Sequence, residues 1–67
     1  MTYYASYGPI HRMAASLRDI RIAARKLALD VKYDIDIVGG GEVIETIHPF
    51  VNGKRWVVRT TKHKEKA

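Results

Sequence analysis

The stretch SLRDIRIAARKLAL, residues 16–29, is the longest amphipathic segment of this 67-residue chain and decides the fold. Its apolar side chains recur at steps of three and four, which places them along one side of an α-helix. They are Leu17, Ile20, Ala24, Leu27 and, just beyond, Val31. Met13 would extend the same row one turn earlier. Ser16 and Asp19 have the spacing of an N-terminal capping box, so we expect the helix to begin near Ser16, although Ala14 and Ala15 could add a turn.

Two groups of side chains on this helix lie outside its apolar row. A basic stripe with i, i+3, i+7 spacing consists of Arg18, Arg21 and Arg25. Such a stripe is either a solvated flank whose long stems cover the rim of the core, or a surface for phosphates or an acidic protein. Ile22 and Leu29 point away from the apolar row, so either the helix is buried on more than one side or they contact a partner. The shortness of the chain favours a partner.

The rest of the sequence alternates with the period of β-strands. The predicted strands are residues 1–8, 31–38, 42–51 and 54–61. Three glycines at 39–41 predict a flexible hairpin loop, and Asn52-Gly53 predicts a tight hairpin with a type I′ turn. We therefore expect an α+β fold in β-α-β-β-β order, with one helix packed on an antiparallel sheet of three to four strands.

Alternation also predicts which side chains face the helix. In the strand at 31–38, the inward residues would be Val31, Tyr33, Ile35 and Ile37. In the last strand, Trp56 and Val58 would share the inner face, with Trp56 beneath the helix, and Arg55, Val57 and Arg59 would lie opposite. A bulge near His48-Pro49 would reconcile the two phases of the third strand, and proline there predicts an edge or a break.

Length and composition predict one domain, residues 1–61, followed by a disordered basic tail, KHKEKA, at 62–67. The chain has no cysteine, and we find neither a signal-peptide pattern nor an apolar run long enough for a membrane span, so we expect a cytoplasmic protein. The formal charge of +5 divides into +4 over residues 1–29, −4 over 30–45 and +5 over 46–67. This mixed pattern permits docking on a protein as well as on nucleic acid.

The chemistry-bearing residues do not predict an enzyme. His11, His48 and His63 lack the i, i+4 spacing of helical metal ligands, and no cysteine supplements them. Asp34 and Asp36 share a strand face but would be exposed, without a pocket to adapt them to acid–base work. The sequence therefore predicts no metal site, no cofactor and no catalysis.

Four short segments carry a family resemblance. They are Ala15-Ser16-Leu17, Arg21-Ile22-Ala23, Asp34–Val38 running into Gly39, and Asn52–Val57, of which Gly-Lys-Arg-Trp-Val is the most distinctive part. In this order they resemble small phage-encoded anti-CRISPR proteins directed at type I CRISPR complexes. The N-terminal strand and residues 42–50 do not match that pattern.

The resemblance implies a non-enzymatic inhibitor that docks on a CRISPR surveillance complex and blocks its binding of target nucleic acid. It implies contact roles for Lys54 and Arg55, which lie in the matching segment. It further implies that the protein acts in the cytoplasm of a bacterial host cell.

Two other functions stay open. A small basic domain could bind DNA or RNA directly through its sheet face and basic helix stripe. The strand and tail residues available for that contact are Lys32, Arg55, Arg59, Lys62 and Lys64. Asp34 and Asp36 argue against it, because they would repel phosphates on the same face. In a third interpretation, Ile22 and Leu29 form the interface of a homodimer.

Overall fold

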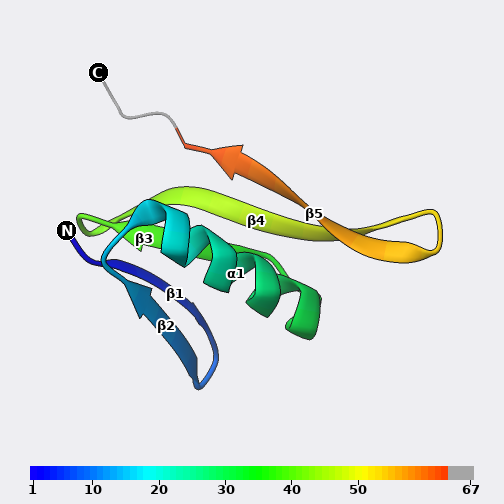
Figure 1. The fold of residues 1–67 in the computed structure, drawn as a ribbon, viewed down its shortest axis with the longest axis horizontal. Coiled ribbons are helices and arrows are strands. Elements are labelled where there is room, and N and C mark those ends of the chain that lie inside the picture. Colours follow the sequence, from blue (N-terminus) through cyan, green and yellow to red (C-terminus); the bar gives the residue numbers. More distant parts are fainter. Residues whose placement is uncertain (64–67) are drawn as a thin grey trace.

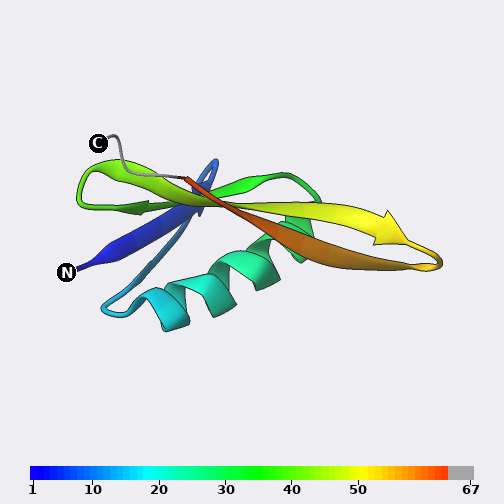
Figure 2. The same ribbon diagram turned by 90° about the horizontal axis from the view of Figure 1, so that it is seen from above.

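The computed structural model describes residues 1–63 and contains one helix and five strands. Their bounds are β1 (Tyr3–Tyr7), β2 (Ile10–Ala14), α1 (Leu17–Val31), β3 (Ile35–Gly39), β4 (Glu42–Asn52) and β5 (Arg55–Lys62). The strands form one antiparallel sheet in the order β2-β1-β3-β4-β5, and α1 covers one of its faces (Figures 1 and 2). The α+β class is confirmed. The predicted three to four strands and the β-α-β-β-β order are wrong, because the chain forms a second strand before the helix.

The additional strand is β2, and Met13 belongs to it rather than to the helix. Gly8 and Pro9 form a two-residue turn that joins β1 to β2, with Tyr7 opposite Ile10. Gly8 has a φ of 57°, and a positive φ at the first loop position is typical of a type II′ hairpin turn. Met13 is 65% exposed on this strand, so its match to the helical period is coincidental.

The helix begins as predicted and ends two residues later. Ser16 is the N-cap, and its hydroxyl accepts a hydrogen bond from the Asp19 N–H at 3.2 Å. At the other end Lys32 adopts the left-handed conformation, with φ 60°, and its N–H donates to the Ala28 carbonyl at 2.7 Å. The prediction of a strand from residue 31 is therefore wrong, and β3 begins only at Ile35.

The core lies between α1 and the centre of the sheet. Its buried side chains are Ala5, Ile20, Ala24, Leu27, Ala28, Ile35, Ile37 and Ile47. Leu17 and Val31 pack at its edge, which confirms the predicted apolar row. Tyr33 was expected to face inward but is exposed, because it lies in the connection between α1 and β3. Its ring stacks on that of Tyr7, with 5.5 Å between the centroids.

β4 extends well beyond its pairing with β3. That pairing ends at Ile35 opposite Ile47, whereas β4 and β5 stay paired as far as Asn52 opposite Arg55. Residues 48–59 therefore form a two-stranded hairpin, which we call the arm, projecting from the body to the right in Figures 1 and 2. The tight hairpin is confirmed, but its loop residues are Gly53 and Lys54, and only Gly53 has a positive φ, of 69°. This pattern is type II′ rather than the predicted type I′.

The bulge lies elsewhere than predicted. The register shifts between Ile37 and Val38, where Ile44 is the extra residue of β4, and pairing through His48-Pro49 is regular. Ile44 consequently packs against the core, while Val43 pairs with Val38. Pro49 lies in the arm, where β4 has no neighbour on its β3 side, so the predicted edge position is confirmed.

The sheet also extends into the segment predicted as a tail, residues 62–67. Lys62 is the last residue of β5, and the His63 N–H donates to the Ile44 carbonyl at 3.0 Å. The remainder of that prediction, residues 64–67, lies outside the described residues.

Candidate functional site

The three arginines of the predicted helix stripe have different surroundings. Arg21 donates from Nε to Glu45 Oε1 at 3.0 Å, and its Nη2 pairs with Oε2 of the same carboxylate. Glu45 lies on β4 and is only 3% exposed, so this bidentate pair attaches the helix to the sheet. The contact raises the pKa of Arg21 above its ordinary value, which keeps the guanidinium charged. Arg18 and Arg25 are exposed, so the stripe is not one continuous binding surface.

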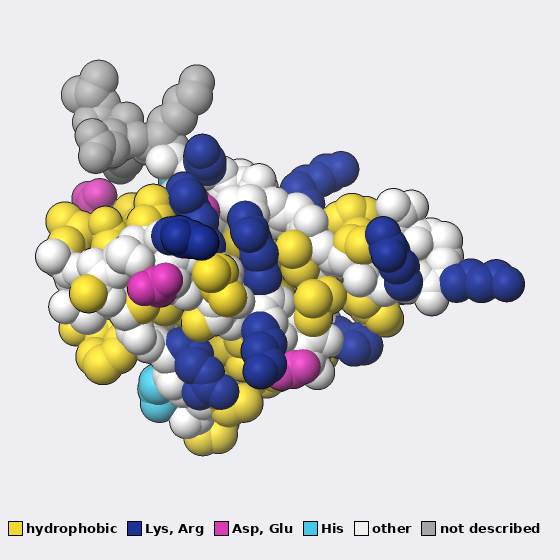
Figure 3. All heavy atoms as spheres, in the orientation of Figure 1, with side chains coloured by type: hydrophobic (Ala, Val, Ile, Leu, Met, Phe, Trp, Pro, Cys, Tyr) yellow, Lys and Arg dark blue, Asp and Glu magenta, His cyan; other side chains and the backbone are white. Residues whose placement is uncertain are grey.

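The outer surface of α1 has nearly balanced charge once Arg21 is paired. Its exposed charged residues are Arg18, Asp19, Arg25, Lys26 and Asp30, three bases less two acids, or +1. Figure 3 shows basic, acidic and hydrophobic side chains mixed over this side of the molecule. Ile22 is 55% exposed among them, as expected for a residue that could contact a partner. Leu29 is half-buried, so it is less accessible than predicted.

The arm has a higher and unmixed charge. Residues 48–59 include Lys54, Arg55 and Arg59 and no acid, which gives +3. Val58 packs against the core on the helix side of β5, so the alternating Arg55 and Arg59 lie on the opposite, open face of the sheet, as predicted. Lys54 is at the tip, where Figure 3 shows basic side chains reaching away from the body. The structure thus brings together the three basic residues predicted for the last hairpin and separates them from the helix stripe.

Each face of the arm presents an exposed aromatic ring beside a cation. On the open face, the guanidinium carbon of Arg59 lies 5.7 Å from the centroid of Phe50. On the other face, Lys32 Nζ lies 5.1 Å from the centroid of Trp56. Trp56 does share a face with Val58, but it is 40% exposed. The prediction that Trp56 packs beneath the helix is wrong. Trp56 lies on the arm, next to the C-cap residue Lys32 at the end of the helix, and not under the helix itself.

Two chains of polar contacts lie at the base of the arm on the open face. Asp34 Oδ2 is 3.1 Å from His48 Nδ1, and His48 Nε2 is 2.9 Å from Thr61 Oγ1. Beside them Thr46 donates to Asp36 at 2.8 Å, and its hydroxyl lies 2.8 Å from the His63 ring. Asp34 and Asp36 therefore face the same side, as predicted, but both are engaged. These partners come from segments far apart in the sequence, so no spacing motif could have indicated them.

The contact order at His48, carboxylate then imidazole then hydroxyl, is that of a hydrolase triad. Its setting differs, because the Asp34 side chain is 61% exposed and water competes for its charge. We assign Asp34 and Thr61 the role of holding the His48 ring in one orientation. The absence of catalysis stays a prediction.

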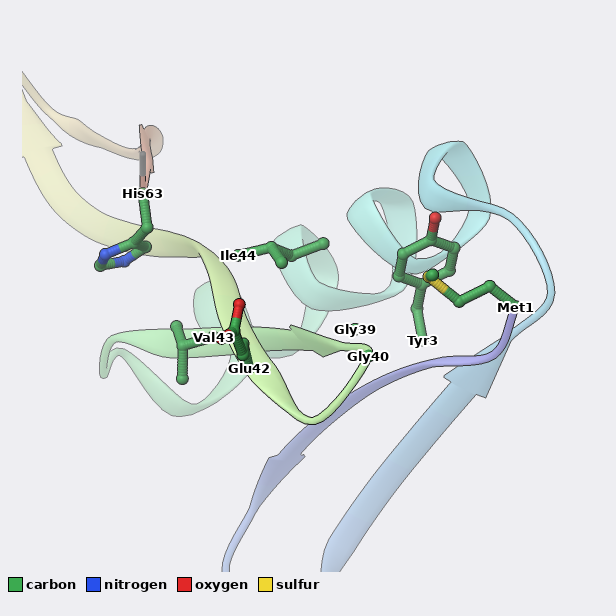
Figure 4. A pocket seen from close by; sticks show the side chains of 8 residues that line it. All are labelled: Met1, Tyr3, Gly39, Gly40, Glu42, Val43, Ile44 and His63. Atoms are coloured by element: carbon green, nitrogen blue, oxygen red, sulfur yellow. The ribbon is translucent and has the colours of Figure 1, made fainter. Parts of the chain in front are cut away.

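Two hollows on the described surface could take part of a ligand. One, of about 420 Å³, lies at the end of the sheet away from the arm; Figure 4 shows Met1 and Tyr3 at one side of it and His63 at the other. Among residues 1–63 its lining includes Glu42 but no lysine or arginine, which does not suit a phosphate. The other, of about 360 Å³, lies at the base of the arm and is lined by His48, Phe50, Arg59 and Thr61. Its cation and aromatic ring make this hollow the better candidate.

Searches against protein-family models, curated proteins and solved structures found no match to this chain. Within residues 1–63, no cluster of three or more histidine, aspartate or glutamate side chains is placed to hold a metal ion. In the same part of the chain, no helix has the length and apolar character needed to cross a membrane.

The Arg21–Glu45 pair predicts an asymmetric response to substitution. Arg21→Met leaves a buried carboxylate without its cation and should lower the free energy of unfolding by about 3 kcal/mol. Glu45→Gln retains a hydrogen-bond acceptor for Arg21 and should cost about 1 kcal/mol. Urea unfolding followed by circular dichroism measures both. Arg18→Met, at an exposed arginine of the same helix, is the control and should change stability by less than about 0.5 kcal/mol. Equal effects of Arg18→Met and Arg21→Met would mean that Arg21 behaves as an exposed residue of the helix stripe and that its pair with Glu45 does not stabilise the fold.

Proposed function

We propose that this chain is a non-enzymatic nucleic-acid-binding protein of the cytoplasm, and that the arm is its principal contact element. The observation that carries the proposal is the concentration of +3 on residues 48–59, a projecting hairpin without an acidic residue. Two-stranded β-ribbons are a known contact element of proteins that bind nucleic acid. Lysine and arginine side chains on such a ribbon gain affinity by displacing counterions from phosphates.

The arrangement of the acidic residues supports the same proposal. Asp34 and Asp36 would repel phosphates that lie close to them on the open face of the sheet. Both carboxylates lie at the base of the arm and are engaged, with His48 and Thr46 respectively. A nucleic-acid backbone that runs along the arm toward Arg55 and the tip therefore lies away from these two carboxylates.

Removing the charge of the arm tests this function. The variant Lys54→Gln/Arg55→Gln/Arg59→Gln should bind labelled DNA or RNA at least tenfold more weakly at 100 mM salt. The slope of log affinity against log salt should become shallower by about 3, roughly one for each lost phosphate contact. Fluorescence anisotropy between 50 and 200 mM salt measures both quantities.

The matched control is Arg18→Gln/Arg25→Gln/Lys26→Gln on the helix. It lowers the formal charge from +5 to +2, as the arm variant does, because each removes three bases. We expect it to weaken binding less than threefold. Equal weakening by the two variants would mean that net charge, and not the arm, governs binding. Failure of the unaltered chain to bind at 50 mM salt would refute the function itself.

A second candidate function is docking on a nucleic-acid-handling protein complex, in particular a type I CRISPR surveillance complex. The observation that favours it is the position of Asn52–Val57, which contains the most distinctive of the segments that carry the resemblance, at the tip of the arm. Val51 and Trp56 add exposed apolar area beside the charges of Lys54 and Arg55, and apolar and arginine side chains together are typical of protein interfaces.

Phage interference measured in a bacterial strain with an active type I system tests this candidate. Expression of the chain should abolish immunity, and Lys54→Gln/Arg55→Gln should restore it, because the change removes the charges at the arm tip. Arg18→Gln/Lys26→Gln, which removes two charges from the helix, is the control and should inhibit like the original chain. Full immunity in the presence of the unaltered chain at matched expression would exclude this function.

A further inference from the structure

The open face of the arm has an aromatic ring between two cations. Phe50 pairs across the hairpin with Val57, and Arg55 and Arg59 lie two residues to either side of Val57 on β5. Side chains two residues apart on a strand point to the same face, so both arginines are diagonal neighbours of the ring. Phe50 is 37% exposed, and the guanidinium of Arg59 lies over it. The order of side chains along this face is therefore cation, ring, cation.

The polar groups around Phe50 are oriented for a ligand. The hollow of about 360 Å³ beside the ring is completed by His48, Arg59 and Thr61. Both nitrogens of His48 are engaged, with Asp34 and Thr61, so its ring stands in a fixed position at the edge of the hollow. Arg59 has no ion pair or side-chain hydrogen bond with any residue in the described range 1–63, and its N–H donors remain available.

A ring between cations matches the chemistry of a nucleotide chain, in which flat bases alternate with phosphates. In a duplex the faces of the bases are stacked on one another and are hidden from a protein side chain. In a single strand they are open to aromatic rings and to guanidinium planes. A contact centred on Phe50 therefore selects single strands, whereas a contact made by charges alone does not.

We propose that the open face of the arm binds single-stranded nucleic acid, with one base stacked at Phe50 and the adjoining phosphates at Arg55 and Arg59. This inference rests on the proposed nucleic-acid-binding function and specifies its substrate class. The bound nucleic-acid strand runs from the hollow beside His48 toward the tip of the arm. In the opposite direction its phosphates would be repelled by the carboxylates of Asp34 and Asp36. Stacking provides affinity for any base, so the site discriminates strandedness more than sequence.

Substitution of the ring separates stacking from charge. Phe50→Ala should weaken binding of a labelled 12-nucleotide oligo-dT or oligo-rU by about 5- to 150-fold, the range that one lost base stack implies. It should weaken binding of a mixed-sequence duplex less than threefold. Phe50→Trp should retain single-strand affinity, because it supplies a larger ring.

Tyr4→Ala is the matched control, because Tyr4 is an exposed aromatic ring of the same sheet that lies on β1, outside the arm, and is 48% exposed against 37% for Phe50. It should change single-strand affinity less than threefold. Equal losses from Phe50→Ala and Tyr4→Ala, or an equal loss on duplex and single strand, would overturn the inference. If neither ring matters while the glutamine variant of the arm still weakens binding, the proposed function stands and only the single-strand assignment fails. If the glutamine variant also binds unchanged, both fail.

Discussion

The structure depends on a mismatch in length between its one helix and its longest strand. The fifteen residues of α1 span about 22 Å, whereas the eleven residues of β4 span about 37 Å. The helix can therefore cover only part of β4, and the buried core of Ile20, Ile35 and Ile47 lies where the two overlap. Val58, opposite Pro49, still packs against the core, whereas Phe50, Val51 and Trp56 farther along the hairpin are exposed. The arm is a direct consequence of this geometry.

The distribution of charge also differs between the helix-covered part of the sheet and the arm. Where the helix covers the sheet, Arg21 and Glu45 neutralise one another in a partly buried pair that spans 24 residues of sequence. At the base of the arm, Asp34 is held by His48 and Asp36 by Thr46. Past that point residues 48–59 carry only basic charge, so the arm has more uncompensated charge than the outer surface of the helix, +3 against +1. The proposed functions both use this property.

Local signals in the sequence predicted the elements that local physics determines. The Ser16 cap, the apolar row of the helix and the glycine-containing hairpins follow from hydrogen bonds and periodicity within a few residues. The strand Ile10–Ala14 was not predicted, because Met13 fits the helical period by coincidence. The dipeptide Gly8-Pro9 before it is a turn signal that is compatible with a hairpin. The exposure of Trp56, the pairing of Arg21 and the contacts of His48 depend on where distant segments meet, and no spacing in the sequence encodes that. The basic residues of the arm were predicted as a group; their separation from the helix stripe was not.

The central claim is that the arm, and not the helix, is the contact element for nucleic acid. Titration of the isotope-labelled chain with a short oligonucleotide, followed by amide chemical shifts in NMR spectra, tests it residue by residue. We predict shift changes concentrated in residues 48–59 and 61, with the outer helix residues Arg18, Ile22 and Arg25 unaffected. Changes concentrated on those helix residues, with the arm silent, would contradict the account.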